Sequence, residues 1–151
     1  MTFPFKEVAC DASIIIELVL SGTNSSLFQS ISKQEFIPFT TILAITEAEY
    51  ILCRKLGKEI AFDKIQNLIG SNYFEIINLD DIHKEASLLK CNRSISLPDC
   101  FIIALAKEKK APALFAFKEE ELTKQIKTKP FDIDIFFLED LNKSAQKKNK
   151  K

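Results

Sequence analysis

The sequence predicts an α/β fold in which helices cover both faces of a parallel sheet of about five strands. Five short segments rich in β-branched and aromatic residues alternate with longer segments of helical period, which is typical of such a sheet. A chain of 151 residues, 46% of them hydrophobic, can bury one sizeable core. We therefore expect a single three-layer α/β/α sandwich over residues 1–142.

The elements of the first half follow from apolar runs and from the residues that end them. Residues 5–10 predict a strand, and Asp11, a favoured N-cap residue, begins a helix over residues 12–20. Small polar residues at 21–25 predict a turn, which is followed by a helix to about residue 33 and a strand at 36–39. Apolar residues at helical spacing then predict helices over 41–56 and 58–69, ended by Gly57 and Gly70.

The second half repeats the alternation. A strand at residues 73–77 precedes a helix over about 80–91, and Ser96-Leu97-Pro98-Asp99 predicts the start of a buried helix over 97–109. A strand at 113–117, a helix at 118–127 and a strand at 133–138 complete the fold. Residues 143–151 are polar and rich in lysine, so we expect them to be a disordered tail.

The charge balance argues against a protein that coats nucleic acid. All 21 acidic residues but only 16 of the 21 basic residues precede Lys143, so the body carries about −5. Binding to duplexes by charge alone needs a basic surface. An RNA-cutting enzyme is still compatible, because divalent ions on a carboxylate site present positive charge to a phosphate.

No apolar run reaches the roughly 20 residues of a membrane span, and the N-terminus lacks the pattern of a secretory signal. We therefore expect a cytoplasmic protein with no membrane partner. Four widely spaced cysteines and the single His83 disfavour a zinc site, and we expect the cysteines to be mostly buried thiols. One histidine also excludes a ribonuclease that works through two histidines.

Three acids follow predicted strands or open predicted helices. Asp11 follows the first strand, Asp99 opens the buried helix, and Glu119 follows the fourth strand. Each has an ordinary explanation, because acids are common at helix N-termini. Their convergence at the carboxyl edge of one sheet would favour a site for a hard cation such as Mg²⁺ or Mn²⁺ instead. Metal-dependent hydrolysis of phosphodiesters is then the leading chemistry.

The helix over residues 41–56 offers two further acids, Glu47 and Glu49. On a helical wheel Glu49 falls within the apolar stripe, whereas Glu47 lies beside Leu43 and Arg54. The stripe consists of Ile42, Ile45, Leu52 and Leu56. A carboxylate on an apolar face must be paired, hydrogen-bonded or bound to metal, so periodicity alone favours Glu49.

The order and spacing of these motifs resemble the PIN-domain nucleases, especially archaeal members similar to VapC-type toxins. The resemblance covers the chain to about residue 138 and rests on Asp11-Ala12-Ser13, on residues 46–57, on residues 96–99 with the alanine-rich continuation, and on residues 116–122. It places the four acids of the family on Asp11, Glu47, Asp99 and Glu119. It therefore favours Glu47 over Glu49, with Ser13 supporting the first acid through a hydrogen bond.

The resemblance implies an endoribonuclease that uses Mg²⁺ or Mn²⁺ held by Asp11, Glu47, Asp99 and Glu119, and that leaves a 5′-phosphate and a 3′-hydroxyl. It also implies the toxin role in a type II toxin–antitoxin pair, with RNA as substrate, a VapB-type antitoxin as partner and a homodimer as assembly. Two positions depart from the pattern: Glu119 replaces the usual Asp, and Phe117 replaces a Thr or Ser.

Two alternatives stay open. A PIN-domain protein of weak or no catalytic activity, acting in RNA processing or as a scaffold, would fit the departures at Phe117 and Glu119. A receiver-like signalling module, for which we expect the same sheet order, would need a second acid beside Asp11 and a Lys after the last strand. Glu139 and Asp140 follow that strand instead.

Overall fold

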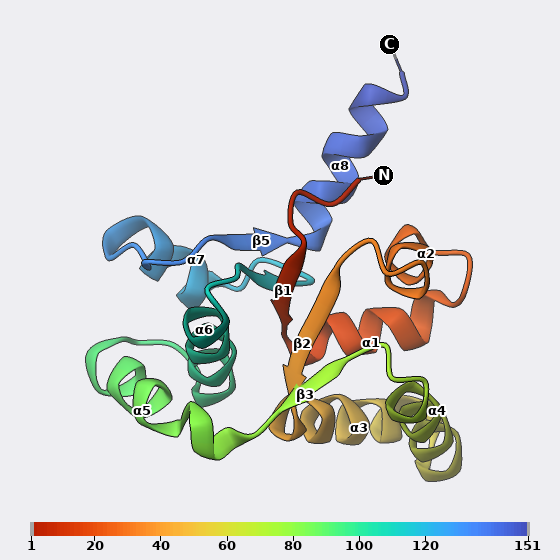
Figure 1. The fold of residues 1–151 in the computed structure, drawn as a ribbon, viewed down its shortest axis with the longest axis horizontal. Helices are drawn as coiled ribbons and strands as arrows, with labels where there is room; N and C mark the ends of the chain where they lie inside the picture. The colour runs from red at the N-terminus through yellow and green to blue at the C-terminus, as the bar shows by residue number, and fades with distance from the viewer. Residues whose placement is uncertain (1, 151) are drawn as a thin grey trace.

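A single five-stranded sheet forms the centre of the molecule (Figure 1). The structure is a computed structural model that describes residues 2–150. All strand pairs are parallel, and the order across the sheet is β3-β2-β1-β4-β5. The strands are β1 (Glu7–Cys10), β2 (Ile37–Thr41), β3 (Glu75–Ile77), β4 (Ala113–Phe115) and β5 (Ile135–Phe137). The predicted α/β class and the parallel sheet are confirmed.

The helices connect these strands in the predicted alternation. They are α1 (Ala12–Ser21), α2 (Ser26–Ser32), α3 (Ile42–Leu56), α4 (Lys58–Gly70), α5 (His83–Asn92), α6 (Leu97–Lys109), α7 (Glu120–Thr128) and α8 (Leu138–Lys148). The helix expected from residue 80 divides into a short 3-10 helix, η1 (Leu79–Asp81), and α5. The break falls at Ile82, whose φ of −125° leaves the helical region.

The two glycines expected to end helices behave differently. Gly57 ends α3 with a φ of +87°, a conformation that glycine adopts without steric penalty. Gly70 remains inside α4, and Asn72 takes the left-handed conformation two residues later. Asparagine tolerates this region better than most residues, so the prediction for Gly70 was wrong by two positions.

The direction of the chain across the sheet reverses at β1. From β1 the chain moves outward through β2 to β3, and then returns to add β4 and β5 on the other side of β1. The point between the carboxyl ends of β1 and β4 is therefore the topological switch point, where parallel sheets bind ligands. Receiver modules have the order 2-1-3-4-5. The expectation that such a module would share this sheet order was wrong, and this alternative is excluded.

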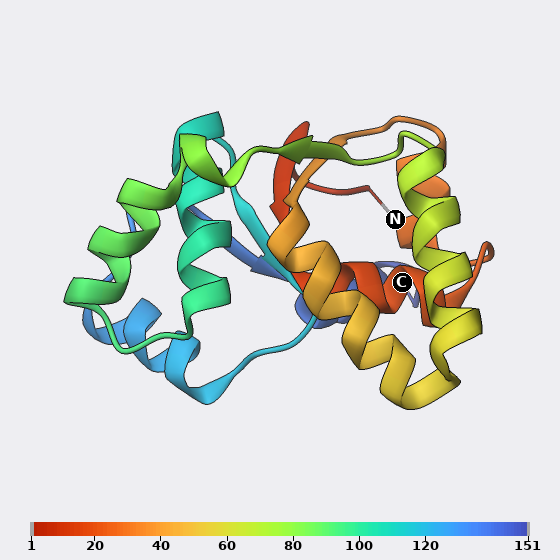
Figure 2. The same ribbon diagram turned by 90° about the horizontal axis from the view of Figure 1, so that it is seen from below.

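Two apolar clusters fill the space on the two faces of the sheet. Val8 and Cys10 contribute to a cluster with α1, α2 and the N-terminal Phe3 and Phe5. Ala9, between them, contributes to the larger cluster with α3, α4, α5 and α6. This alternation follows from the period of two in a strand and builds the three layers. Seen from below, α3 and α4 lie on one side of the molecule and α5, α6 and α7 on the other (Figure 2).

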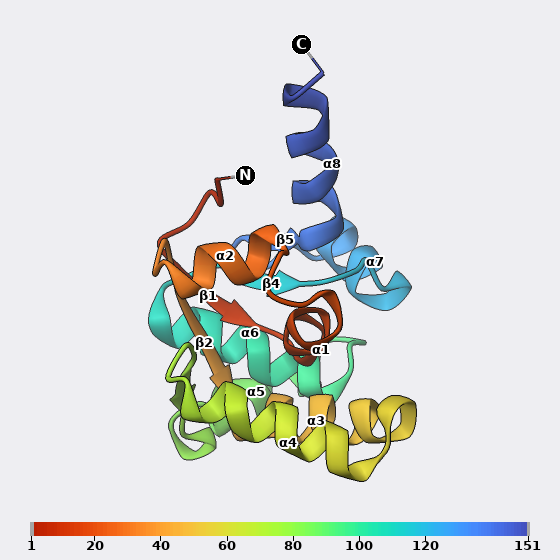
Figure 3. The same cartoon turned by 90° about the vertical axis from the view of Figure 1, so that its right-hand side faces the viewer.

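Helix α8 leaves the body of the protein and carries the C-terminus away from it (Figure 3). Residues 143–148, which we expected to be disordered, continue this helix. The buried Leu138 and the half-buried Leu141 anchor its start on the second cluster. Lys143 pairs with Glu139 one turn earlier, a spacing that supports a helix.

Within residues 2–150 no single helix is long and apolar enough to cross a membrane. The pair α1 and α2 meets the length and composition criteria only when the two helices are joined, and they are bent by 103°.

Candidate active site

Asp11 stands at the switch point of the sheet. Its backbone N–H donates to the Leu114 carbonyl at 3.1 Å, so the residue bridges the ends of β1 and β4. Its side chain caps α1 by accepting the Ser13 N–H at 3.0 Å and is only 9% exposed. Asp11 is therefore a helix cap, and it is also a buried carboxylate at the edge where parallel sheets bind ligands, so the two interpretations do not exclude each other.

Ser13 contacts Asp11 through its backbone and not through its hydroxyl. Its backbone N–H supports the Asp11 carboxylate, whereas its hydroxyl accepts the Ala116 N–H at 3.0 Å. This bond ties the start of α1 to the loop that follows β4. Ser13 therefore fixes the position of Asp11 relative to the segment that carries Glu119.

Glu47 lies in the second turn of α3, whose start is fixed by two buried threonines. The Thr41 hydroxyl caps α3 by accepting the Ala44 N–H at 3.2 Å. The Thr40 hydroxyl donates to the Cys10 carbonyl at 3.0 Å and ties the end of β2 to the end of β1. Sequence reasoning missed both threonines. Two consecutive threonines between a strand and a helix were the available signal, because Thr is a favoured cap residue.

Asp99 lies in the first turn of α6 and is 7% exposed. The Ser96 hydroxyl caps the helix by accepting the Asp99 N–H at 3.2 Å, and Pro98 occupies the first turn, as predicted. The loop before Ser96 is held by Arg93. This guanidinium donates to the Pro130 carbonyl at 3.1 Å and stacks on the Phe131 ring at 3.8 Å from its centroid.

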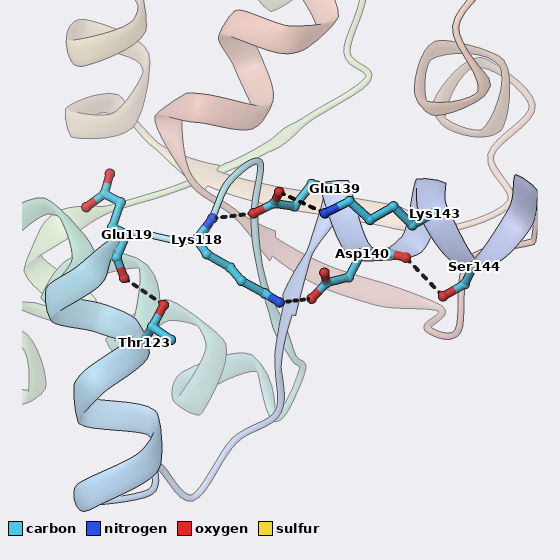
Figure 4. A network of polar contacts seen from close by, with 7 residues as sticks. All are labelled: Lys118, Glu119, Thr123, Glu139, Asp140, Lys143 and Ser144. Carbon is cyan, nitrogen blue, oxygen red and sulfur yellow. Dashed lines mark hydrogen bonds and ion pairs between the residues drawn. The ribbon is translucent and has the colours of Figure 1, made fainter.

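Glu119 occupies the N-cap position of α7, but its side chain makes no capping hydrogen bond. In Figure 4 its carboxylate points away from Thr123 and from the contacts of the preceding residue. That residue, Lys118, donates its backbone N–H to Glu139 at 2.8 Å and pairs its ammonium with Asp140 at 2.8 Å. The loop before Glu119 is therefore tied to the first turn of α8, and the nearest lysine in sequence is directed toward α8.

The four predicted acids form one electrostatic group. Burial first, and then the carboxylates of Asp11, Glu119 and Glu47, raise the pKa of Asp99 to about 7, against a lowering hydrogen bond from Ser96. Burial also raises the pKa of Glu47, with added repulsion from Asp11 and Glu119. The pKa of Glu119 is raised by burial, by Asp11 and by its neighbour Glu121. No basic side chain of the described residues contributes to the shifts of these three pKa values.

The structure groups Glu47 with the other acids, as the resemblance implied and the helical wheel did not. The wheel placed Ile42 in the core stripe, but Ile42 is exposed. The buried face of α3 consists of Ala44, Ile45, Ala48 and Leu52, and the two acids flank this face on opposite sides. The small alanines mark the true core face, and hydrophobicity alone gives them too little weight.

The carboxylates lie near one another, but their oxygen atoms do not converge on one position. In the described part of the chain, no three His, Cys, Asp or Glu side chains are placed tightly enough to hold a metal ion as they stand. The donor set nevertheless suits Mg²⁺ or Mn²⁺, because all four side chains offer hard oxygen atoms and repel one another without a cation.

The thiols beside two of these acids are unsuited to bind metal. Cys10 and Cys100 are buried, and burial raises the pKa of both thiols; the Asp11 carboxylate raises that of Cys10 further. Both stay protonated near neutral pH, whereas the thiolate is the form that binds metal. His83 lies exposed at the start of α5, where its ring contacts the Asp80 carbonyl at 3.1 Å, in line with its expected place at a solvated helix start.

Comparison with solved structures finds the same fold in toxins of toxin–antitoxin systems. The VapC20 toxin of Mycobacterium tuberculosis, which cleaves the sarcin-ricin loop, superposes with a TM-score of 0.59 at 16% identity over 78% of this chain and 94% of that one. VapBC2 of Rickettsia felis, solved with a DNA fragment from its promoter, gives 0.66 at 14% identity over 87% and 98%. A toxin–antitoxin complex from Klebsiella pneumoniae gives 0.56 at 18% identity over 82% and 92%.

No curated protein matches the sequence at a significant level. The family profile of the PIN domain, in contrast, matches residues 8–127. This range extends from β1 almost to the end of α7 and includes all four acids of the cluster. The chain therefore belongs to the PIN-domain family.

Proposed function

We propose that this protein is a Mg²⁺- or Mn²⁺-dependent endoribonuclease and the toxin of a type II toxin–antitoxin pair. One observation carries the proposal: four carboxylates from separate segments gather at the switch point of the sheet, where Asp11 raises the pKa values of Glu47, Asp99 and Glu119. Mutual repulsion of carboxylates without a positive partner destabilises a fold. A cation that neutralises their charge is therefore the expected ligand.

The four acids would have different roles according to how deeply each is buried. Asp11 and Asp99 are buried and fixed by helix caps, so they would hold an ion directly. Glu47 and Glu119 are less buried and would act through water molecules, which they could orient for in-line attack on the phosphate. A bound Mg²⁺ or Mn²⁺ would lower the pKa of the attacking water and stabilise the leaving 3′-oxygen. The products would carry a 5′-phosphate and a 3′-hydroxyl.

The proposed partners follow from the relatives. The neighbours from Rickettsia felis and Klebsiella pneumoniae are toxin–antitoxin complexes. We extend this likeness to a VapB-type antitoxin that covers the carboxylate site, and to a homodimer as the assembly. The RNA substrate of such a toxin would place the protein in the cytoplasm.

A PIN-domain protein with weak or no activity is the second candidate. Its support is the pair of departures beside the site: Glu119 has one more methylene than the usual Asp, and the exposed Phe117 replaces a hydroxyl-bearing residue. A scaffold would keep the fold and bind RNA without cutting it.

The deciding experiment is RNA cleavage by the purified chain in EDTA, Mg²⁺ and Mn²⁺, with the product ends identified. We expect cleavage only with the metals, and 5′-phosphate ends. Asp11→Asn and Asp99→Asn preserve shape and remove charge, so each should abolish cleavage while the circular dichroism spectrum is unchanged. Glu108→Gln, at the exposed far end of the Asp99 helix, is the matched control. Cleavage that survives both Asp→Asn changes would end the metal-site proposal.

A further inference from the structure

Phe117 is displayed to solvent on a loop that is held on both sides. Its side chain is 56% exposed, and it lies two residues before Glu119. Ala116 before it is buried and donates its N–H to the Ser13 hydroxyl, while the Lys118 N–H after it donates to Glu139. A large apolar ring kept in water by a fixed backbone loses the free energy that burial would provide. A ligand that covers the ring would recover this free energy.

A second exposed aromatic residue lies on α3, the helix that carries Glu47. Tyr50 is 45% exposed and follows Glu47 by three residues, so it lies one turn further along the same helix face. The Arg54 guanidinium lies 5.0 Å from the centroid of the Tyr50 ring. Helical geometry places Arg54 almost directly in line with Glu47, about 10 Å along the axis. An acid, a ring and a cation therefore follow one another along α3.

The charge of the protein restricts how it could bind RNA. The body carries about −5, and the site itself gathers four carboxylates, so general attraction to phosphates is weak here. Stacking of bases on aromatic side chains does not depend on net charge, and it accepts any base that is unpaired. Arg54 adds the positive charge that a phosphate beside a stacked base requires.

We propose that Phe117 and the Tyr50–Arg54 pair are two base-stacking subsites that flank the carboxylate cluster, and that they hold the unpaired nucleotides on either side of the cut phosphate. The proposal rests on the proposed nuclease function, because it takes RNA as the ligand. In addition, much of the RNA affinity of this chain would come from stacking of bases on these aromatic rings. Only unpaired bases can stack in this way.

Measurements of RNA affinity at several salt concentrations separate the contribution of base stacking from that of charge. The probe is a short single-stranded RNA, bound in Ca²⁺ in place of Mg²⁺ and checked for intactness afterwards. Phe117→Ala and Tyr50→Ala should each weaken binding by about 5- to 100-fold with an unchanged salt slope. Arg54→Ala should reduce the slope of log affinity against log salt concentration by about one unit, the value of one lost phosphate contact. Tyr50→Phe should recover most of the affinity that Tyr50→Ala loses.

The control is Phe62→Ala, which removes a similarly exposed ring (41%) from α4. It should bind RNA as the wild type does. If Phe117→Ala and Tyr50→Ala also bind as the wild type, or if all three weaken binding equally, the subsites do not exist.

A fluorescence measurement tests stacking directly and does not depend on cleavage. The sequence contains no Trp, so Phe117→Trp introduces a single reporter, and Phe62→Trp is its matched control. Single-stranded RNA should quench the first variant and not the second, and a duplex of the same sequence should quench neither. Absence of quenching at saturating RNA would overturn the proposal. So would an emission change that depends on protein concentration without RNA, because it would show that a second copy covers this face.

The two proposals can fail separately. If the wild type cuts no RNA with Mg²⁺ or Mn²⁺ but single-stranded RNA quenches Phe117→Trp, the nuclease proposal fails and the subsites stand. If the wild type cuts RNA and Phe117→Ala binds and cuts equally well, the subsites fail and the nuclease stands.

Discussion

Neutralising Asp99 should stabilise the metal-free protein and abolish its response to metal. The pKa of this carboxyl lies at about 7 in the folded chain, against an ordinary value of 3.8, chiefly because it is buried and then because Asp11, Glu119 and Glu47 surround it. The folded state therefore holds the proton more tightly than the unfolded state. The resulting stabilisation is complete below pH 3.8 and is lost as the pH rises through about 7.

The magnitude follows from this difference in pKa. At about 1.4 kcal/mol per pH unit, the charged form of Asp99 destabilises the folded protein by about 4 kcal/mol above neutral pH. Relaxation of the neighbouring carboxylates reduces this value, so we expect Asp99→Asn to gain about 2 to 4 kcal/mol at pH 8 in EDTA. For a domain of this size that gain corresponds to a rise in melting temperature of roughly 4 to 16 °C.

The assay is urea unfolding in EDTA between pH 5 and 8, with Glu108→Gln as the matched control. The unfolding free energy of the wild type should fall across this range, and that of Asp99→Asn should fall much less. Mn²⁺ at about 100 times its dissociation constant should restore roughly 3 kcal/mol to the wild type and almost nothing to the variant. A wild-type stability that is flat with pH in EDTA, or an Asp99→Asn variant no more stable than Glu108→Gln at pH 8, would refute the reasoning.

Three further changes test other parts of the site. Glu47→Gln should lose RNA cleavage and Glu49→Gln should keep it, and wild-type activity in Glu47→Gln would mean that the helix acid is misassigned. Glu139→Ala removes the acceptor for the Lys118 N–H and should lower cleavage about tenfold in kcat with little change in KM; Glu139→Gln keeps an acceptor oxygen and should recover most of that rate. Deleting residues 143–151 removes the outer turns of α8 but not Leu138, so the melting temperature should change little, with weaker RNA affinity at low salt only. Unfolding of the truncated chain would place the domain boundary beyond residue 142.

The local parts of the fold were predictable because local chemistry determines them. The Ser96 cap and Pro98 in the first turn define the start of α6, and the predicted and observed bounds of that helix agree. All five strands were also predicted to within two residues at each end.

The parts that sequence did not yield depend on contacts between distant segments. The position of Ile42 in α3 resembles a core position on a helical wheel, and only the packed structure shows that Ala44 and Ala48 face inward instead. Helix α8 depends on Leu138 and Leu141 docking on a cluster formed largely by the N-terminal half. The hydrogen bond between the Ser13 hydroxyl and the Ala116 N–H joins two residues that are 103 positions apart in the sequence, and no periodic pattern predicts it.

The positions of these acids at helix N-termini are compatible with their proposed role as metal ligands. Asp11 caps α1, Asp99 lies in the first turn of α6 and Glu119 occupies the N-cap position of α7, so three of the four acids lie at the positive ends of helix dipoles. This placement offsets part of the repulsion among them. The offset is incomplete, since the pKa values of Asp99 and Glu119 remain raised. Helix caps thus bring the acids together, and the repulsion that remains is the free energy that a bound cation can recover.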